Sequence, residues 1–168
     1  KDGHYYVCTG RFGFGLFNPE NGAFAPLKET HPELERFSLM THMVTYGKNQ
    51  LLVGTQNGLF LYHTKNQQVT IPPTGNQRTD ARFRHSNNKY NCLFVDSRQN
   101  LWFGTQDGLN VWCPSVGKSY AFYMEDGLTS NTVQALVEDS NHAIWATTTN
   151  GLTRINLTQQ AGEPDFSL

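Results

Sequence analysis

A segment of eight residues recurs four times along the chain, and each copy ends at a glycine. The copies lie at residues 6–13, 51–58, 101–108 and 144–151, and their final glycines are 45, 50 and 43 residues apart. Internal periods of about 40 to 50 residues are typical of helical solenoids and of β-propellers. The residues that fill the period therefore decide which architecture the chain adopts.

Each copy has the pattern of a β-hairpin. An apolar, β-branched or aromatic run leads into a turn, and a second apolar run follows it. In the last three copies the turn falls at Asn57-Gly58, Asp107-Gly108 and Asn150-Gly151. Such pairs favour a type I′ turn, in which both central residues have positive φ. The first copy has Phe12 before Gly13, so we expect a turn of another type there.

Two further strands complete the period. Residues 90–96 and 133–139 align at an offset of 43 and supply an inner strand, while turn-rich stretches at 18–24 and 113–120 lead into an outer one. A single four-stranded sheet cannot cover both of its apolar faces, so neighbouring repeats must pack on each other. The sequence therefore predicts an all-β fold of four-stranded antiparallel meanders, stacked as β-propeller blades. A β-sandwich is the weaker alternative, because it does not require the repeat.

The chain holds just under four blades and is therefore an incomplete propeller. The first blade lacks its innermost strand, and the last has only residues 159–168 for its outer one. A loop after the second blade is seven residues longer than its counterpart after the third, and it is basic. We expect blades at 1–30, 37–72, 88–124 and 131–168, with the inserted basic loop at 73–87.

Composition limits the classes of partner. Thirteen Lys and Arg against fourteen Asp and Glu give a net charge of −1, so no overall field attracts nucleic acid. No apolar run reaches the roughly 18 residues of a membrane span, and the chain begins at Lys1 without a signal peptide, as an excised piece of a longer protein does. Cys8, Cys92 and Cys113 are widely spaced, and the histidines lack metal-binding spacing. We expect no metal and no cofactor.

Residues 127–156 closely resemble the two-component regulator propeller repeat. The resemblance rests on Gly127-Leu-Thr-Ser-Asn131, on the Asp139 loop, on Ile144-Trp145 and on the run that begins at Gly151, and the third blade repeats it. In that family, such propellers form the periplasmic sensor region of hybrid histidine kinases of Bacteroidetes, which detect polysaccharide fragments. The resemblance implies a periplasmic sensor module within an inner-membrane protein. Its implied partners are an oligosaccharide, the rest of its own propeller and a second copy of the parent protein.

Antiparallel strands bring one set of loops to a common face. The turn after the second strand of each blade and the exit from its fourth strand lie at the same end of the sheet. Guanidinium groups there could hold a carboxylate or a sulfate, and amides could bind hydroxyl groups, which favours an acidic oligosaccharide. A solvated basic loop is the plainer interpretation. The candidate ligand-binding residues are Arg11, Gln56, Arg78, Arg82, Arg84, His85, Gln106 and Asn131.

The tryptophans and the loop aspartates have structural interpretations. Trp102 and Trp145 occupy one repeat position, which indicates packing between blades rather than sugar stacking. Asp96 and Asp139 open equivalent loops, where a short carboxylate caps backbone N–H groups.

An enzyme needs an acid and a base that converge in a cleft, and Glu125 and Asp126 are the only clustered candidates. We therefore expect a non-catalytic sensor portion. The alternatives are a propeller-fold lyase or glycosidase, and a protein-interaction platform.

Overall fold

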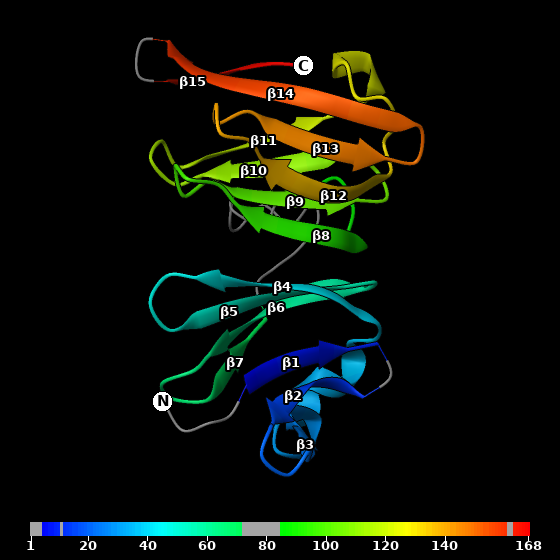
Figure 1. The fold of residues 1–168 in the computed structure, drawn as a ribbon, viewed down its shortest axis with the longest axis vertical. Helices are drawn as coiled ribbons and strands as arrows, with labels where there is room; N and C mark the ends of the chain where they lie inside the picture. Colours follow the sequence, from blue (N-terminus) through cyan, green and yellow to red (C-terminus); the bar gives the residue numbers. More distant parts are fainter. Residues whose placement is uncertain (1–4, 11, 72–84, 161–162) are drawn as a thin grey trace.

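Four antiparallel sheets follow one another along the chain in this computed structural model, which describes residues 5–10, 12–71, 85–160 and 163–168 (Figure 1). Each sheet is a meander with its strands in sequence order. Residues 51–62 and 101–112 form hairpins and not helices. The all-β fold of propeller blades is therefore confirmed.

The first sheet, blade one, has three strands, and the other three have four. Blade one consists of β1 (Tyr5–Thr9), β2 (Gly13–Phe17) and β3 (Phe24–Pro26); blade two of β4 (Met40–Tyr46), β5 (Gln50–Thr55), β6 (Gly58–His63) and β7 (Gln68–Thr70); blade three of β8 (Tyr90–Val95), β9 (Leu101–Thr105), β10 (Leu109–Cys113) and β11 (Lys118–Phe122); and blade four of β12 (Val133–Glu138), β13 (Ile144–Thr148), β14 (Gly151–Gln160) and β15 (Glu163–Ser167).

Short 3₁₀ turns connect some of the blades. The segments η1 (Leu27–Glu29) and η2 (Pro32–Arg36) lie between blades one and two, and η4 (Met124–Asp126) lies between blades three and four. Among the described residues, no helix has the length and apolar character needed to cross a membrane. Most of the inserted basic loop expected at 73–87 lies outside the described residues, and the residue limits of the four blades stay predictions.

The hairpin turns differ from the predicted type I′. In blade two, Thr55 pairs with Gly58, so the two central residues are Gln56 and Asn57. Neither central residue has positive φ, whereas Gly58 has φ of 140°. The turns of blades three and four likewise have positive φ only at their glycine. The prediction of type I′ was wrong because the glycine is the fourth residue of the turn, a position that type I turns favour for glycine.

A threonine hydroxyl stabilises the equivalent turn in each of the four blades by hydrogen bonds. Its Oγ1 donates to the carbonyl of the turn glycine and accepts the N–H of the residue just before that glycine. In blade three, Thr105 donates to Gly108 at 2.8 Å and accepts from Asp107 at 3.0 Å. The equivalent threonines are Thr9, Thr55 and Thr148. These hydrogen bonds satisfy backbone groups at the tips of these four hairpins.

The inner strand of blades two, three and four carries a β-bulge at the same repeat position, at Thr41, Asn91 and Gln134. The hydroxyl of Thr41 donates to the carbonyl of Tyr90 at 2.6 Å, and the side-chain amide of Asn91 donates to the carbonyl of Val133 at 2.8 Å. A bulge redirects a side chain, and here it points a polar group at the inner strand of the next blade. Gln134 is exposed.

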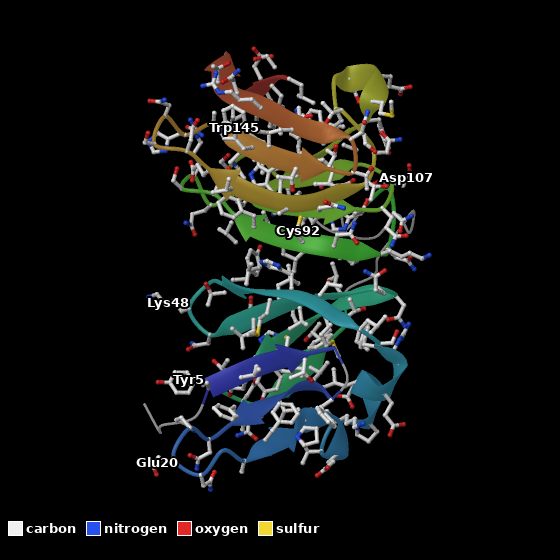
Figure 2. All side chains as sticks on the ribbon, turned by 45° about the vertical axis from the view of Figure 1, so that its right-hand side comes forward. Tyr5, Glu20, Lys48, Cys92, Asp107 and Trp145 are labelled. Atoms are coloured by element: carbon white, nitrogen blue, oxygen red, sulfur yellow. The ribbon has the colours of Figure 1, made fainter. Side chains whose placement is uncertain are left out.

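Apolar side chains fill the space between successive blades (Figure 2). Leu52, Tyr90 and Phe103 are fully buried where blade two meets blade three, and Trp102 and Ile144 are fully buried where blade three meets blade four. The predicted packing role of Trp102 is therefore confirmed. Each blade depends on its neighbours to remove its apolar faces from water.

The three cysteines are free thiols. Burial raises the pKa of Cys8, Cys92 and Cys113 to about 12, and in Cys113 the nearby Asp96 adds to the effect. The thiols therefore stay protonated at neutral pH, which makes them poor nucleophiles and poor metal ligands.

Asp96 organises the loop between β8 and β9 from a buried position. It accepts hydrogen bonds from the backbone N–H of Arg98 and Asn100, from the Asn100 amide, and from Nε1 of Trp102 at 2.9 Å. Asp139 repeats the arrangement in blade four and accepts from Nε1 of Trp145 at 2.8 Å, but it is less buried. The carboxylate joins the loop to the indole of the next strand in both blades.

Replacing Asp96 by alanine should destabilise the chain by roughly 2–4 kcal/mol, because buried donors, including the Trp102 indole, lose their acceptor. Asp139→Ala is the matched control, and it should cost less because water can reach its loop. Urea denaturation of the full chain measures both changes. A cost for Asp139→Ala equal to or larger than that for Asp96→Ala would contradict the explanation.

Candidate functional site

The two ends of the sheets form two different faces. Figure 2 places Asp107 on the edge opposite to Tyr5, Glu20 and Lys48. We call the side with the β1–β2, β5–β6, β9–β10 and β13–β14 turns the turn face, and the side with the loop at 96–100 the opposite face. The turn face also receives the described segment that leaves the outer strand of blade three, and it carries the predicted ligand-binding residues Gln56, Gln106 and Asn131.

Polar side chains from consecutive blades meet on the turn face. The Gln106 amide donates to Oε1 of Gln56 at 3.2 Å, and the Gln56 amide donates to Oδ1 of Asn91 at 3.4 Å. The hydroxyl of Thr132 donates to the backbone carbonyl of Gln106 at 3.3 Å. Blades two, three and four are thereby linked by one polar chain. Such mutual hydrogen bonds hold the amides in defined orientations while Gln106 stays exposed.

Asn131 lies beside this polar chain. Its side-chain carbonyl accepts the backbone N–H of Met124 at 2.8 Å, and its amide lies 3.5 Å from the Asp107 carboxylate. Its backbone carbonyl accepts the N–H of Gly108 at 2.7 Å. The exit from blade three is therefore held against the turn of the same blade. The structure brings Gln56 and Gln106 into contact and places Asn131 on the same face.

His85 lies in the core. Only 3% of it is exposed, its Nδ1 lies 2.8 Å from the Tyr90 hydroxyl, and its ring centroid is 3.9 Å from that of Phe103. It occupies the repeat position that Leu128 fills in the following blade, where the leucine is also 3% exposed. A ligand on the surface of the turn face would not reach this imidazole.

The four arginines that were expected to hold an anionic group lie outside the described residues. They are Arg11, Arg78, Arg82 and Arg84. Their role stays a prediction.

Asn91 was not among the predicted site residues, although it connects Gln56 to the next blade. The signal that identifies it is the bulge at this position, which one extra residue creates in the inner strand. Among the described residues, there is no group of three His, Cys, Asp or Glu side chains that could hold a metal ion.

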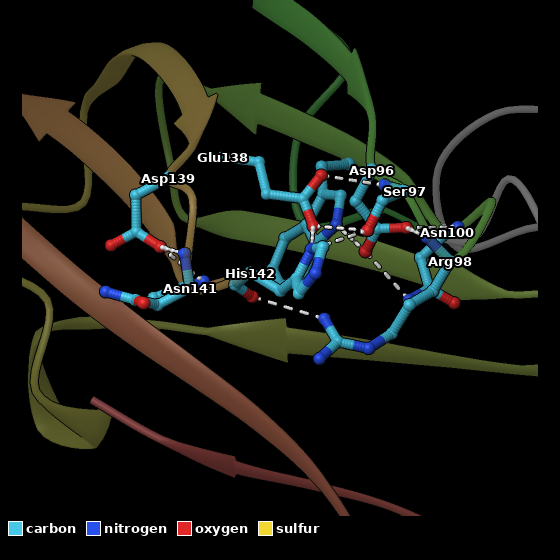
Figure 3. A network of polar contacts seen from close by, with 10 residues as sticks. Asp96, Ser97, Arg98, Asn100, Glu138, Asp139, Asn141 and His142 are labelled. Carbon is cyan, nitrogen blue, oxygen red and sulfur yellow. Dashed lines mark hydrogen bonds and ion pairs between the residues drawn. The ribbon is translucent and has the colours of Figure 1, made fainter.

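A second polar cluster joins blades three and four on the opposite face (Figure 3). Oε1 of Glu138 accepts the Ser97 hydroxyl at 2.6 Å and lies 3.1 Å from Nδ1 of His142, while Oε2 accepts the Ser97 N–H at 2.8 Å. Arg98 donates to the backbone carbonyl of His142 at 3.2 Å. Partial burial alone raises the pKa of Glu138, but the hydrogen bonds from Ser97 and His142 outweigh it and lower this pKa below its ordinary value of 4.5.

Residues 85–107 and 127–150 match the family described as two component regulator propeller. Two stretches of the chain, in blades three and four, thus match two-component regulator propeller repeats. The matched segments include the buried aspartate loop and the hairpin turn of blade three, and the exit and the equivalent hairpin of blade four. The predicted family is therefore confirmed.

Proteins similar to this chain in sequence or structure include a histidine kinase and two hybrid two-component systems. A histidine kinase named P4 from Formosa agariphila is 34% identical, in a match that covers 60% of this chain and 11% of that protein. The extracellular domains of two hybrid two-component systems from B. thetaiotaomicron superpose with TM-scores of 0.69 and 0.67, at 17% and 20% identity. The matches cover 90% and 98% of this chain and 20% of each solved chain. This chain thus spans only a small part of the length of these relatives.

The fold also occurs in an enzyme. Virginiamycin B lyase from Staphylococcus aureus superposes with a TM-score of 0.51 at 16% identity, over 77% of this chain and 41% of the lyase. At this identity, the likeness concerns the fold alone.

Replacing Glu138 by glutamine should destabilise the propeller at neutral pH, and the difference from wild type should shrink in acid. The folded pKa of Glu138 is lower than the unfolded one, so its contribution is complete above about pH 4.5 and is lost as the pH falls through the folded value. Urea midpoints of both full chains, measured from neutral pH down to about pH 3, test this. A difference that does not change with pH would show that the carboxylate charge is irrelevant.

Proposed function

We propose that this chain is part of the periplasmic sensor region of a hybrid two-component regulator. In this proposal the propeller binds an oligosaccharide, and the signal passes to a histidine kinase in another part of the parent protein. The observation that carries the proposal is the match of residues 85–107 and 127–150 to the regulator propeller family. The similarity to extracellular domains of hybrid two-component systems supports the same role.

The turn face is the side that we propose for ligand binding. The hydrogen-bonded amides of Gln56 and Gln106 offer donors and acceptors at fixed positions, which suits the hydroxyl groups of a sugar. Arg78, Arg82 and Arg84 belong to the long connection that follows blade two in the sequence, and we propose that they contribute to this face. Guanidinium groups bind carboxylates and sulfates through paired hydrogen bonds, so we propose an acidic oligosaccharide.

We propose that this portion does not catalyse a reaction. The carboxylate of Asp126 accepts the backbone N–H of Tyr123 at 2.8 Å and so caps η4. Its neighbour Glu125 lies in the same exposed turn. A glycosidase needs two carboxyl groups on opposite sides of the scissile bond, which two successive residues of one turn do not provide.

The remaining partners follow from the incomplete propeller and from the family. We propose that further blades of the parent protein cover the exposed apolar residues at the surface of blade four, Val137 and Leu152. We also propose that the parent protein is an inner-membrane homodimer, in which ligand binding changes the packing or the dimer geometry.

The triple replacement of Arg78, Arg82 and Arg84 by alanine in the intact sensor region tests the proposed ligand. We expect wild type to bind one of two sugars, tetragalacturonate or alginate tetrasaccharide, in calorimetric titrations. Each lost charge-assisted contact should cost on the order of 1.5 to 3 kcal/mol, and wild-type affinity should fall as salt rises.

The double variant Lys48→Ala/Lys65→Ala removes positive charge from the opposite face and is the control, which should bind like wild type. If the triple variant binds within about twofold of wild type, the basic loop is not the anion site. Steady release of shorter or unsaturated sugars during the titration would favour the lyase or glycosidase alternative.

A further inference from the structure

Blade one departs from the repeat at the turn between β1 and β2. Thr9 pairs with Gly13, so the connection has three residues instead of two. Phe12 stands where the other blades have Asn57, Asp107 and Asn150 before their glycines. Phe12 is 58% exposed, and its ring lies 6.5 Å from that of Phe24, so one part of the ring packs on blade one while the rest faces solvent.

A cavity of about 490 Å³ opens beside this turn. Its apolar lining includes Phe12, Phe14, Phe37 and Leu39, and Lys28 and Glu35 add charged groups. The volume lies within the range of about 300–1,000 Å³ that is usual for small-molecule sites. The cavity lies between the turn of blade one and the connection through η1 and η2 to blade two.

The corresponding space in blade three is closed. There the ring of Tyr123 packs on the turn, and a Cβ placed on Gly108 would lie 2.9 Å from it. A Cβ placed on Gly13 would meet only the end of the Met40 side chain, at 3.8 Å. The turn of blade one is therefore more open than the turn of blade three.

Leu39 on the wall of the cavity has a strained backbone. Its φ is 49°, in the left-handed region that leucine rarely adopts, and it is 57% exposed. Burial of this side chain does not compensate for the strain. Strained backbone of this kind is concentrated at ligand sites, where the surrounding structure holds it in place.

Lys28 and Glu35 provide charge beside the apolar wall. Both side chains are exposed, and neither forms an ion pair within the described part of the chain. An ammonium group donates hydrogen bonds, and a carboxylate accepts them. The cavity thus combines an exposed aromatic ring with one donor group and one acceptor group.

We propose that this cavity is a subsite for one sugar ring of the oligosaccharide, and this inference rests on the proposed function. A pyranose has an apolar face that packs on an aromatic ring such as Phe12, and its hydroxyl groups can reach Lys28 and Glu35. The cavity lies on the turn face, so an oligosaccharide bound at the amides of blades two and three and at this cavity would extend along one surface.

Phe12→Asn in the intact sensor region tests the subsite, because asparagine is the residue that two other blades have at this position. The protein is first screened on an array of acidic and neutral glycans, and the strongest binder is then titrated by calorimetry. The dissociation constant should rise about fivefold to tenfold, the loss expected from one aromatic stacking contact. Tyr5→Ala removes an equally exposed aromatic ring from the other end of β1 and should leave binding unchanged.

Leu39→Gly supplies a second measurement that does not depend on the stacking contact. Glycine tolerates positive φ, so the melting temperature without sugar should rise by about 1–3 °C while the affinity for the same sugar falls. If wild type binds a glycan and the dissociation constants of both variants lie within about twofold of the wild-type value, the proposed subsite is wrong and the proposed function stands. If wild type binds no glycan on the array, the subsite and the proposed function both fail.

Discussion

The structure depends on the contact between one blade and the next. An isolated four-stranded meander would leave both apolar faces in water, and side chains such as Trp102 and Phe103 lose their exposure only because neighbouring blades cover them. Apolar packing of this kind does not fix the register between sheets. The bulge side chains of Thr41 and Asn91 do so, because each donates to one particular carbonyl in the next inner strand.

This arrangement also positions the candidate site. Stacking brings equivalent turns to one face, where Gln56 of blade two meets Gln106 of blade three. A face built from equivalent turns offers similar chemistry at each blade, so we propose that ligand selectivity comes from blades that break the pattern. Blade one does this with its three-residue turn and the exposed Phe12, and blade two does it with the long basic connection.

The sequence predicted the strands well because the repeat is long and its turns carry glycine. It failed at the turn type, since glycine was assumed to be a central residue, whereas the Thr55 hydroxyl and the fourth-position Gly58 define the turn. The bulge at Asn91 was missed because one inserted residue breaks the alternation by which strands are recognised. His85 was assigned to a surface loop, although its alignment with Leu128 would have indicated a core position. The cavity in blade one depends on the path of η1 and η2, which no local pattern predicts.

We propose that the turn face of this propeller receives an oligosaccharide. Hydrogen–deuterium exchange of the intact sensor region, with and without the strongest binder from a glycan array, tests it most directly. The account predicts slower exchange on binding at residues 10–13, 55–58 and 105–108, with no change in the loops at 96–100 and 139–143. Protection confined to those two loops, or no protection anywhere in the chain at saturating glycan, would contradict the account.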